Sequence, residues 1–158
     1  MCTRSCYFIG HREASEEIYA QLRGAVERHI VEFCVTEFIV GHYGSFDRMA
    51  ARAVIEAKKM HPEVTLTLLL PYHPTERPIA APEGFDGTYY PPGMERVPRR
   101  VAIVRANRYM VDHVDYLIAY AWHPGSNARE LVEYAKDREI HGKIKVTQID
   151  KFRLNEYN

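Results

Sequence analysis

Three short glycine-containing segments carry residue types that can bind an anion. Their candidate ligand-binding residues are Gly10, His11, Arg12, Gly41, Gly44, Ser45, Pro124, Gly125, Ser126 and Asn127. Glycine lets the backbone approach a phosphate closely, and the first N–H groups of a following helix add positive partial charge. Each segment by itself is also an ordinary tight turn, but the three together predict a site for a nucleotide or a nucleotide-derived ligand.

A group of arginines forms a second candidate feature. Residues 96–111 contain five arginines and no Asp or Glu. If this stretch is helical, Arg105 and Arg108 are three positions apart and share a face. A guanidinium group matches a phosphate with two parallel hydrogen bonds. We therefore expect both side chains at the ligand site, and a merely solvated face is the alternative.

Two carboxylates could perform acid–base chemistry. Glu130 and Asp47 are the candidates, because hydrolysis of a glycosidic bond uses flanking carboxyl groups. Both positions also have a structural interpretation, since an acidic residue at the start of a helix caps it or favours its positive end. Whether the chain is an enzyme is left open by these residues.

Alternating strands and helices position these segments. We predict strands at 6–9, 37–40, 64–70, 116–120 and 144–149, and helices at 16–33, 48–60, 100–111 and 128–138. This order predicts an α/β, Rossmann-like three-layer fold with a mainly parallel five-stranded sheet in the order 3-2-1-4-5. Ligands of such sheets bind beyond the carboxyl ends of the strands, where the winding reverses. All three glycine segments follow strands and should meet there.

One segment has a different composition. Residues 71–99 contain seven of the nine prolines, which predicts a long loop inside a single domain spanning residues 1–158. A long loop in a compact domain is commonly a lid or a binding loop.

Composition limits the partners. The chain has 21 basic and 21 acidic residues, and this zero net charge disfavours nucleic acid and an anionic membrane. No stretch is apolar enough to span a bilayer, and the first residues lack the long apolar core that is typical of a signal peptide, so we expect a cytoplasmic protein. The three cysteines match neither a zinc pattern nor an even disulfide set, and we expect no metal and no cofactor. A homo-oligomer remains open.

Several motifs resemble the SLOG superfamily, which joins the Smf/DprA DNA-processing proteins to the LOG phosphoribohydrolases. They are residues 8–12, 41–47, 95–100, 105–110 and 115–119 followed by 124–127. The resemblance implies a Rossmann-like fold and a nucleotide site. In LOG enzymes a PGGxGTxxE motif supplies the glutamate for N-glycosidic cleavage. Here Ser126 replaces the second glycine and Val132 stands at the glutamate position, so the resemblance favours binding over catalysis.

Three functions follow from these observations. The leading hypothesis is a binding module for a nucleotide or nucleotide-derived ligand, such as a signalling sensor. The first alternative is a nucleoside 5′-monophosphate N-glycosidase that uses Glu130 or Asp47. The second alternative is a DprA-like binder of single-stranded nucleic acid, which the zero net charge disfavours.

Overall fold

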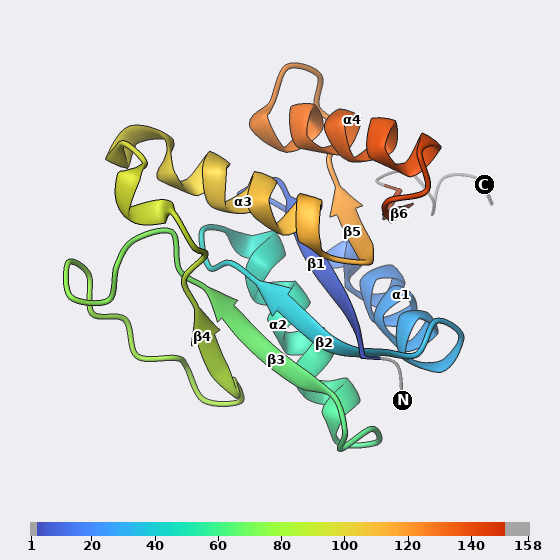
Figure 1. The fold of residues 1–158 in the computed structure, drawn as a ribbon. Coiled ribbons are helices and arrows are strands. Elements are labelled where there is room, and N and C mark those ends of the chain that lie inside the picture. The colour runs from blue at the N-terminus through green and yellow to red at the C-terminus, as the bar shows by residue number, and fades with distance from the viewer. Residues whose placement is uncertain (1–2, 151–158) are drawn as a thin grey trace.

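The computed structural model describes residues 3–150 and is a three-layer α/β fold (Figure 1). Six parallel strands form one sheet in the order β4-β3-β2-β1-β5-β6. The strands are β1 (Arg4–Gly10), β2 (Val35–Val40), β3 (Thr65–Leu69), β4 (Gly87–Tyr89), β5 (Tyr116–Tyr120) and β6 (Lys145–Gln148). The predicted fold class is confirmed, and the five predicted strands have the predicted order; β4 is an additional strand at one edge.

Four α-helices cover the two faces of the sheet. They are α1 (Tyr19–Val31), α2 (Ser45–Lys58), α3 (Ala102–His113) and α4 (Asn127–Ile140), with short 3₁₀ helices η1 (Glu16–Ile18), η2 (Met94–Arg96) and η3 (Arg99–Val101). Helices α1 and α2 pack on one face, and α3 and α4 on the other. None of the helices within residues 3–150 is long and apolar enough to cross a membrane.

The alternation of side chains along β1 explains how both layers are held. Cys6 and Phe8 belong to the core under α1 and α2, whereas Tyr7 and Ile9 belong to the core under α3 and α4. Successive side chains of a strand point to opposite faces, so a strand buried on both faces is apolar throughout. Within the buried residues 6–9 of β1, the Tyr7 hydroxyl is the one side-chain oxygen.

The proline-rich segment is more ordered than a plain loop. It contains β4, η2 and the first residue of η3. Strand β4 pairs with β3. Beside it the Asp86 carboxylate accepts a hydrogen bond from the Leu66 N–H at 2.8 Å, and the backbone oxygen of Tyr89 accepts one from the Leu70 N–H at 2.8 Å. A three-residue strand carries too little periodicity to be predicted, because its position comes from pairing with a distant strand.

The switch in winding lies between β1 and β5. From β1 the chain winds through β2 and β3 to β4, and it then crosses to β5 and β6 on the other side. The turns after β1, β2 and β5 therefore converge at the carboxyl edge of the sheet. This is the position at which open α/β sheets bind their ligands.

Candidate functional site: a cleft at the switch point

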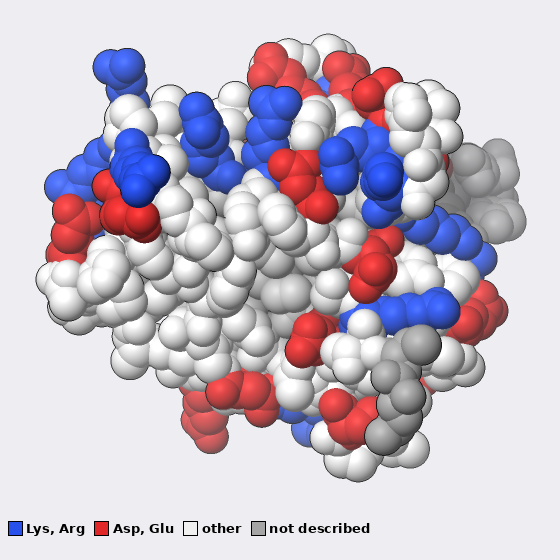
Figure 2. Space-filling view, viewed as in Figure 1, with Lys and Arg blue, Asp and Glu red and all other residues white. Residues whose placement is uncertain are grey.

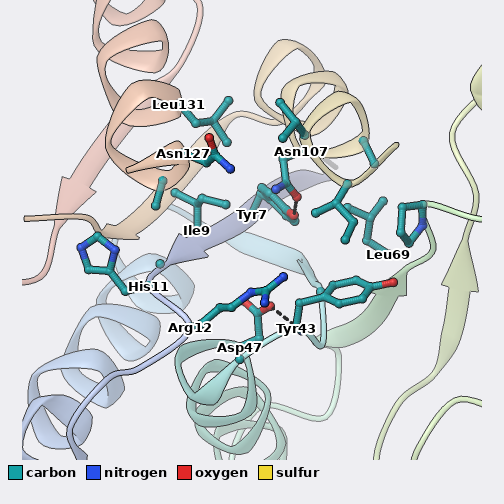
Figure 3. Close-up of a pocket in the computed structure, with 18 of the residues that line it drawn as sticks. Tyr7, Ile9, His11, Arg12, Tyr43, Asp47, Leu69, Asn107, Asn127 and Leu131 are labelled. Carbon is teal, nitrogen blue, oxygen red and sulfur yellow. Dashed lines mark hydrogen bonds between the residues drawn. The ribbon is translucent and has the colours of Figure 1, made fainter. Parts of the chain in front are cut away.

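A cleft of about 280 Å³ opens at this edge, between the carboxyl ends of β1, β2 and β3 and the helices α3 and α4 (Figure 3). This volume is near the lower end of the range for small-molecule sites, about 300–1,000 Å³. Its walls combine apolar side chains with a few polar groups. The apolar lining residues are Ile9, Leu69, Pro71, Ile103, Val104, Ala106, Ala128 and Leu131.

The floor of the cleft carries a hydroxyl–amide pair. Tyr7 points up from β1 and donates a hydrogen bond to Asn107 Oδ1 on α3 (Figure 3). Burial, followed by the negative charge of Asp47 and the nearby Tyr43, raises the pKa of Tyr7 well above its usual value. Tyr7 is therefore a neutral donor at physiological pH, and Asn107 keeps its amide nitrogen as a donor toward a ligand.

Asp47 is the carboxylate of this cleft. It lies in the first turn of α2, and its Oδ2 accepts a hydrogen bond from the Tyr43 N–H at 3.1 Å. Burial raises the pKa of Asp47 to about 6, and the Tyr43 N–H and the Arg48 charge oppose this rise. Most Asp47 side chains are thus ionised at pH 7, and slight acidification protonates them. The expectation that Asp47 caps this helix is wrong, because Gly44 is the N-cap of α2 and Asp47 lies in the first turn, where its charge favours the positive end of the helix.

His11 and Arg12 form one rim. Both line the cleft, and Arg12 is the one Lys or Arg among its lining residues within the described chain. The backbone N–H of His11 donates a hydrogen bond to the backbone oxygen of Tyr120 at 3.2 Å. The Nε2 atom of His11 accepts one from the backbone N–H of His123 at 3.1 Å. These contacts join the turn after β1 to the turn after β5, and they place a cation beside the cleft opening.

The amino end of α4 adds backbone donors. Ser126 is the N-cap, and its Oγ accepts a hydrogen bond from the Arg129 N–H at 3.1 Å. Asn127 and Ala128 are the next two residues of the chain and line the cleft together with Ser126. The first N–H groups of a helix have no partner within it and sit at its positive end. An anion in the cleft can therefore bind without further basic side chains.

Two of the glycines have a packing role that the sequence did not reveal. A Cβ on Gly44 would lie 2.5 Å from Arg12 Cα, and one on Gly10 would lie 2.3 Å from a ring carbon of Phe46. The Ser45 N–H at the start of α2 donates to the Arg12 oxygen at 2.8 Å. The protein's own backbone therefore covers the start of α2, and α4 offers the accessible helix end.

The predicted binding residues fall into two groups. The cleft is lined by Gly10, His11, Arg12, Gly41, Gly44, Ser126 and Asn127, together with Asp47. Pro124 and Gly125 belong to the same edge, in the exposed turn between β5 and α4, but do not line the cleft. Ser45 is also outside the lining, since its Oγ accepts from the Ala14 N–H at 2.6 Å and donates to the Arg12 oxygen at 2.9 Å. Ligand contact by any of them stays a prediction.

The two arginines of α3 do not face the cleft. Arg105 and Arg108 are exposed and line a separate hollow on the outer side of the helix. Figure 2 shows Lys and Arg gathered along the upper part of this face, over α3 and α4, and an uncharged area below them. Asn107 faces the cleft instead, because neighbouring helix positions are rotated by about 100°. The expectation that Arg105 and Arg108 lie at the cleft is corrected accordingly.

The second predicted carboxylate is also remote. Glu130 is exposed on α4 and does not line the cleft, so it and Asp47 do not flank a common space. Within residues 3–150, no cluster of three or more His, Cys, Asp or Glu side chains could hold a metal ion.

Sequence reasoning missed several cleft residues. Tyr7, Tyr43 and the apolar walls were not predicted as site residues. Tyr7 carried a usable signal, since a phenol in an otherwise apolar buried strand needs a hydrogen-bond partner. Tyr43 and Leu69 carried none, because their approach to the cleft depends on how β2 and β3 pack beside β1.

Comparison with known proteins shows the fold. No protein-family model matches the chain, and no curated protein sequence matches it. Among solved structures, the chain is similar to DNA processing protein A from Helicobacter pylori, described for its single-stranded DNA binding mode. The TM-score is 0.57 and the sequence identity 14%, over 90% of this chain and 64% of that chain. This chain thus spans less than two thirds of that protein.

This likeness corrects one expectation. The sequence-based expectation against a nucleic-acid partner is wrong, because the fold is shared with a protein that binds single-stranded DNA. Zero net charge is a poor guide here, since exposed charges are largely screened beyond about 10 Å. Local charge matters more than net charge over such distances, and the local positive charges at this cleft are Arg12 and the amino end of α4.

Proposed function

We propose that this chain binds single-stranded nucleic acid and holds one nucleotide of the strand in the cleft. The likeness in fold to a single-stranded DNA-binding protein, over 90% of the chain, supports this proposal. The observation that carries it is the cleft itself, which combines apolar walls, a cation and backbone donors at the switch point. Membership of the SLOG superfamily and a cytoplasmic location are parts of the same proposal.

The chemistry of the cleft suits a nucleotide unit. The apolar side chains of α3 and β3 offer surfaces for a base, while Arg12 and the N–H groups of Asn127 and Ala128 suit the phosphate. Asn107 and Asp47 supply a donor and an acceptor for polar groups of the base or the sugar. Binding of this kind uses few charges, which is compatible with a neutral protein.

Fluorescence anisotropy with an end-labelled mixed-sequence single strand tests the proposal. We expect the single strand to bind more tightly than its duplex, and binding to weaken with salt. Arg12→Ala should weaken binding and lower the slope of log K against log salt by about 0.7, the value for one phosphate contact on a single strand.

Arg28→Ala is the matched control, because Arg28 lies in the last turn of α1 near the opposite edge of the sheet, where it pairs with the C-cap residue Glu32. It should leave both the affinity and the salt slope unchanged. Absence of single-strand binding by the parent protein, or equal losses in the two variants, would refute the proposal.

A free nucleotide is the second candidate ligand, and the size of the cleft favours it. About 280 Å³ has room for one nucleotide and not for several. Competition of the labelled strand by nucleoside monophosphates distinguishes the two. Complete displacement at micromolar mononucleotide, with no single-strand advantage, would assign the cleft to a free nucleotide.

A further inference from the structure

An exposed tryptophan stands beside the cleft. Trp122 follows β5, and 42% of its surface is exposed. Among the exposed large hydrophobic residues of the described chain, Trp122 and Tyr89 are the aromatic ones. Tyr89 lies in the edge strand β4, whereas Trp122 lies in the turn that leads to the start of α4.

Contacts with histidine connect Trp122 to the rim. Its ring centroid is 5.4 Å from that of His11, with the two planes at 78°, and 5.3 Å from that of His123. His11 lines the cleft, and its Nε2 accepts the His123 N–H. The indole therefore packs against a hydrogen-bonded pair of histidines, and one of these, His11, lies between it and the cleft.

An exposed indole leaves apolar surface in contact with water, which is unfavourable in free energy, and a stacked ligand would cover that surface. An aromatic side chain of this size gains stability when its surface is buried, and nucleobases stack on aromatic rings whatever their sequence. Trp122 belongs to the turn between β5 and α4, and this turn ends at the helix start whose N–H groups suit a phosphate.

We propose that Trp122 is a stacking platform for the base adjacent to the nucleotide in the cleft. The proposal rests on the proposed function, since it assigns a second subsite on the same strand. It makes the minimal binding unit two nucleotides long, and it predicts little sequence preference at the second position because stacking reads no hydrogen-bond pattern.

The chain contains a single tryptophan, so its intrinsic fluorescence reports directly on this subsite. Titration of the parent protein with an oligothymidylate should quench the Trp122 emission in parallel with the anisotropy of a labelled strand. Trp122→Ala should weaken single-strand binding about 5- to 150-fold, the range for loss of one stacked base. Trp122→Phe should restore most of the affinity.

Met60→Ala is the matched control, because Met60 is 80% exposed and follows α2 near the opposite edge of the sheet. Its affinity should equal that of the parent. Single-strand binding with unchanged Trp122 emission, or with unchanged affinity of Trp122→Ala, would overturn the platform and leave the proposed function intact. If the parent protein does not change the anisotropy of the labelled strand, both the platform and the proposed function are overturned.

Discussion

Replacement of Asp47 by asparagine should stabilise the protein at neutral pH. The carboxyl group lies in the cleft wall, where burial raises its pKa from 3.8 to about 6. At about 1.36 kcal/mol per pH unit, ionised Asp47 lowers the free energy of unfolding by up to about 3 kcal/mol. Asparagine has nearly the same shape, and its amide oxygen can still accept the Tyr43 N–H. The variant removes the charge and keeps the contact.

The pH dependence gives the sign of this effect. Between pH 3.8 and about 6 the folded state holds the Asp47 proton that the unfolded chain has released. Unfolding then releases a proton, so the contribution of Asp47 to stability falls as pH rises through this window and stays low above it. The stability difference between Asp47→Asn and the parent should be small near pH 4, grow toward pH 6 and then level off.

Urea unfolding of both proteins from about pH 4 to about pH 8, followed by circular dichroism, measures this difference. The other titrating groups are common to both proteins, so their contributions to the pH dependence cancel in the difference between variant and parent. A stability difference that does not change with pH, or a parent that is more stable than the variant at pH 7, would refute the burial of this carboxyl group.

Three further outcomes are expected. Single-strand binding by the parent should tighten as pH falls below about 6, because protonation of Asp47 removes a negative charge from the cleft and leaves an oxygen that still accepts a hydrogen bond. The affinity of Asp47→Asn should stay constant over this range, and equal changes of affinity with pH in the two proteins would contradict this. Gly44→Ala should cost about 1–3 kcal/mol in urea unfolding, since its Cβ would lie 2.5 Å from Arg12 Cα, and strand affinity should fall with it. Asp86→Asn should destabilise the protein at pH 7, because Lys58 and then a backbone N–H lower the pKa of Asp86. That loss should disappear in acid as the parent's carboxylate is protonated, and an Asp86→Asn deficit that persists there would count against it.

Much of the fold was predictable because its signals are local. The apolar run at residues 6–9 and the helical period at residues 16–33 are visible in short windows of sequence. Their alternation leaves few allowed topologies, so the relative order of five strands could be predicted and is confirmed. The same rule brought three glycine turns to one edge of the sheet, and the structure shows them there.

The composition of the cleft was predictable only in part. Arg105 and Arg108 carry the charges that attract attention in the sequence, but the buried residues of α3 include Ala102 and Ala106. With Met110 and Val111 these alanines form an apolar face at helical spacing, and this face leaves out Arg105 and Arg108. The expectation for the two arginines followed their charge instead of this period. Packing of α3 on the sheet then turns Asn107 toward the cleft.

By itself, the sequence determined the order and type of the main elements, because propensity and hydrophobic period act within a few residues of each other. The tertiary structure alone decided which side chains share the cleft. Tyr7 meets Asn107 across 100 residues, and His11 meets His123 across 112. Strand β4 likewise exists only through its pairing with β3. Such contacts depend on the packing of whole layers, which leaves no periodic trace at either end of the contact.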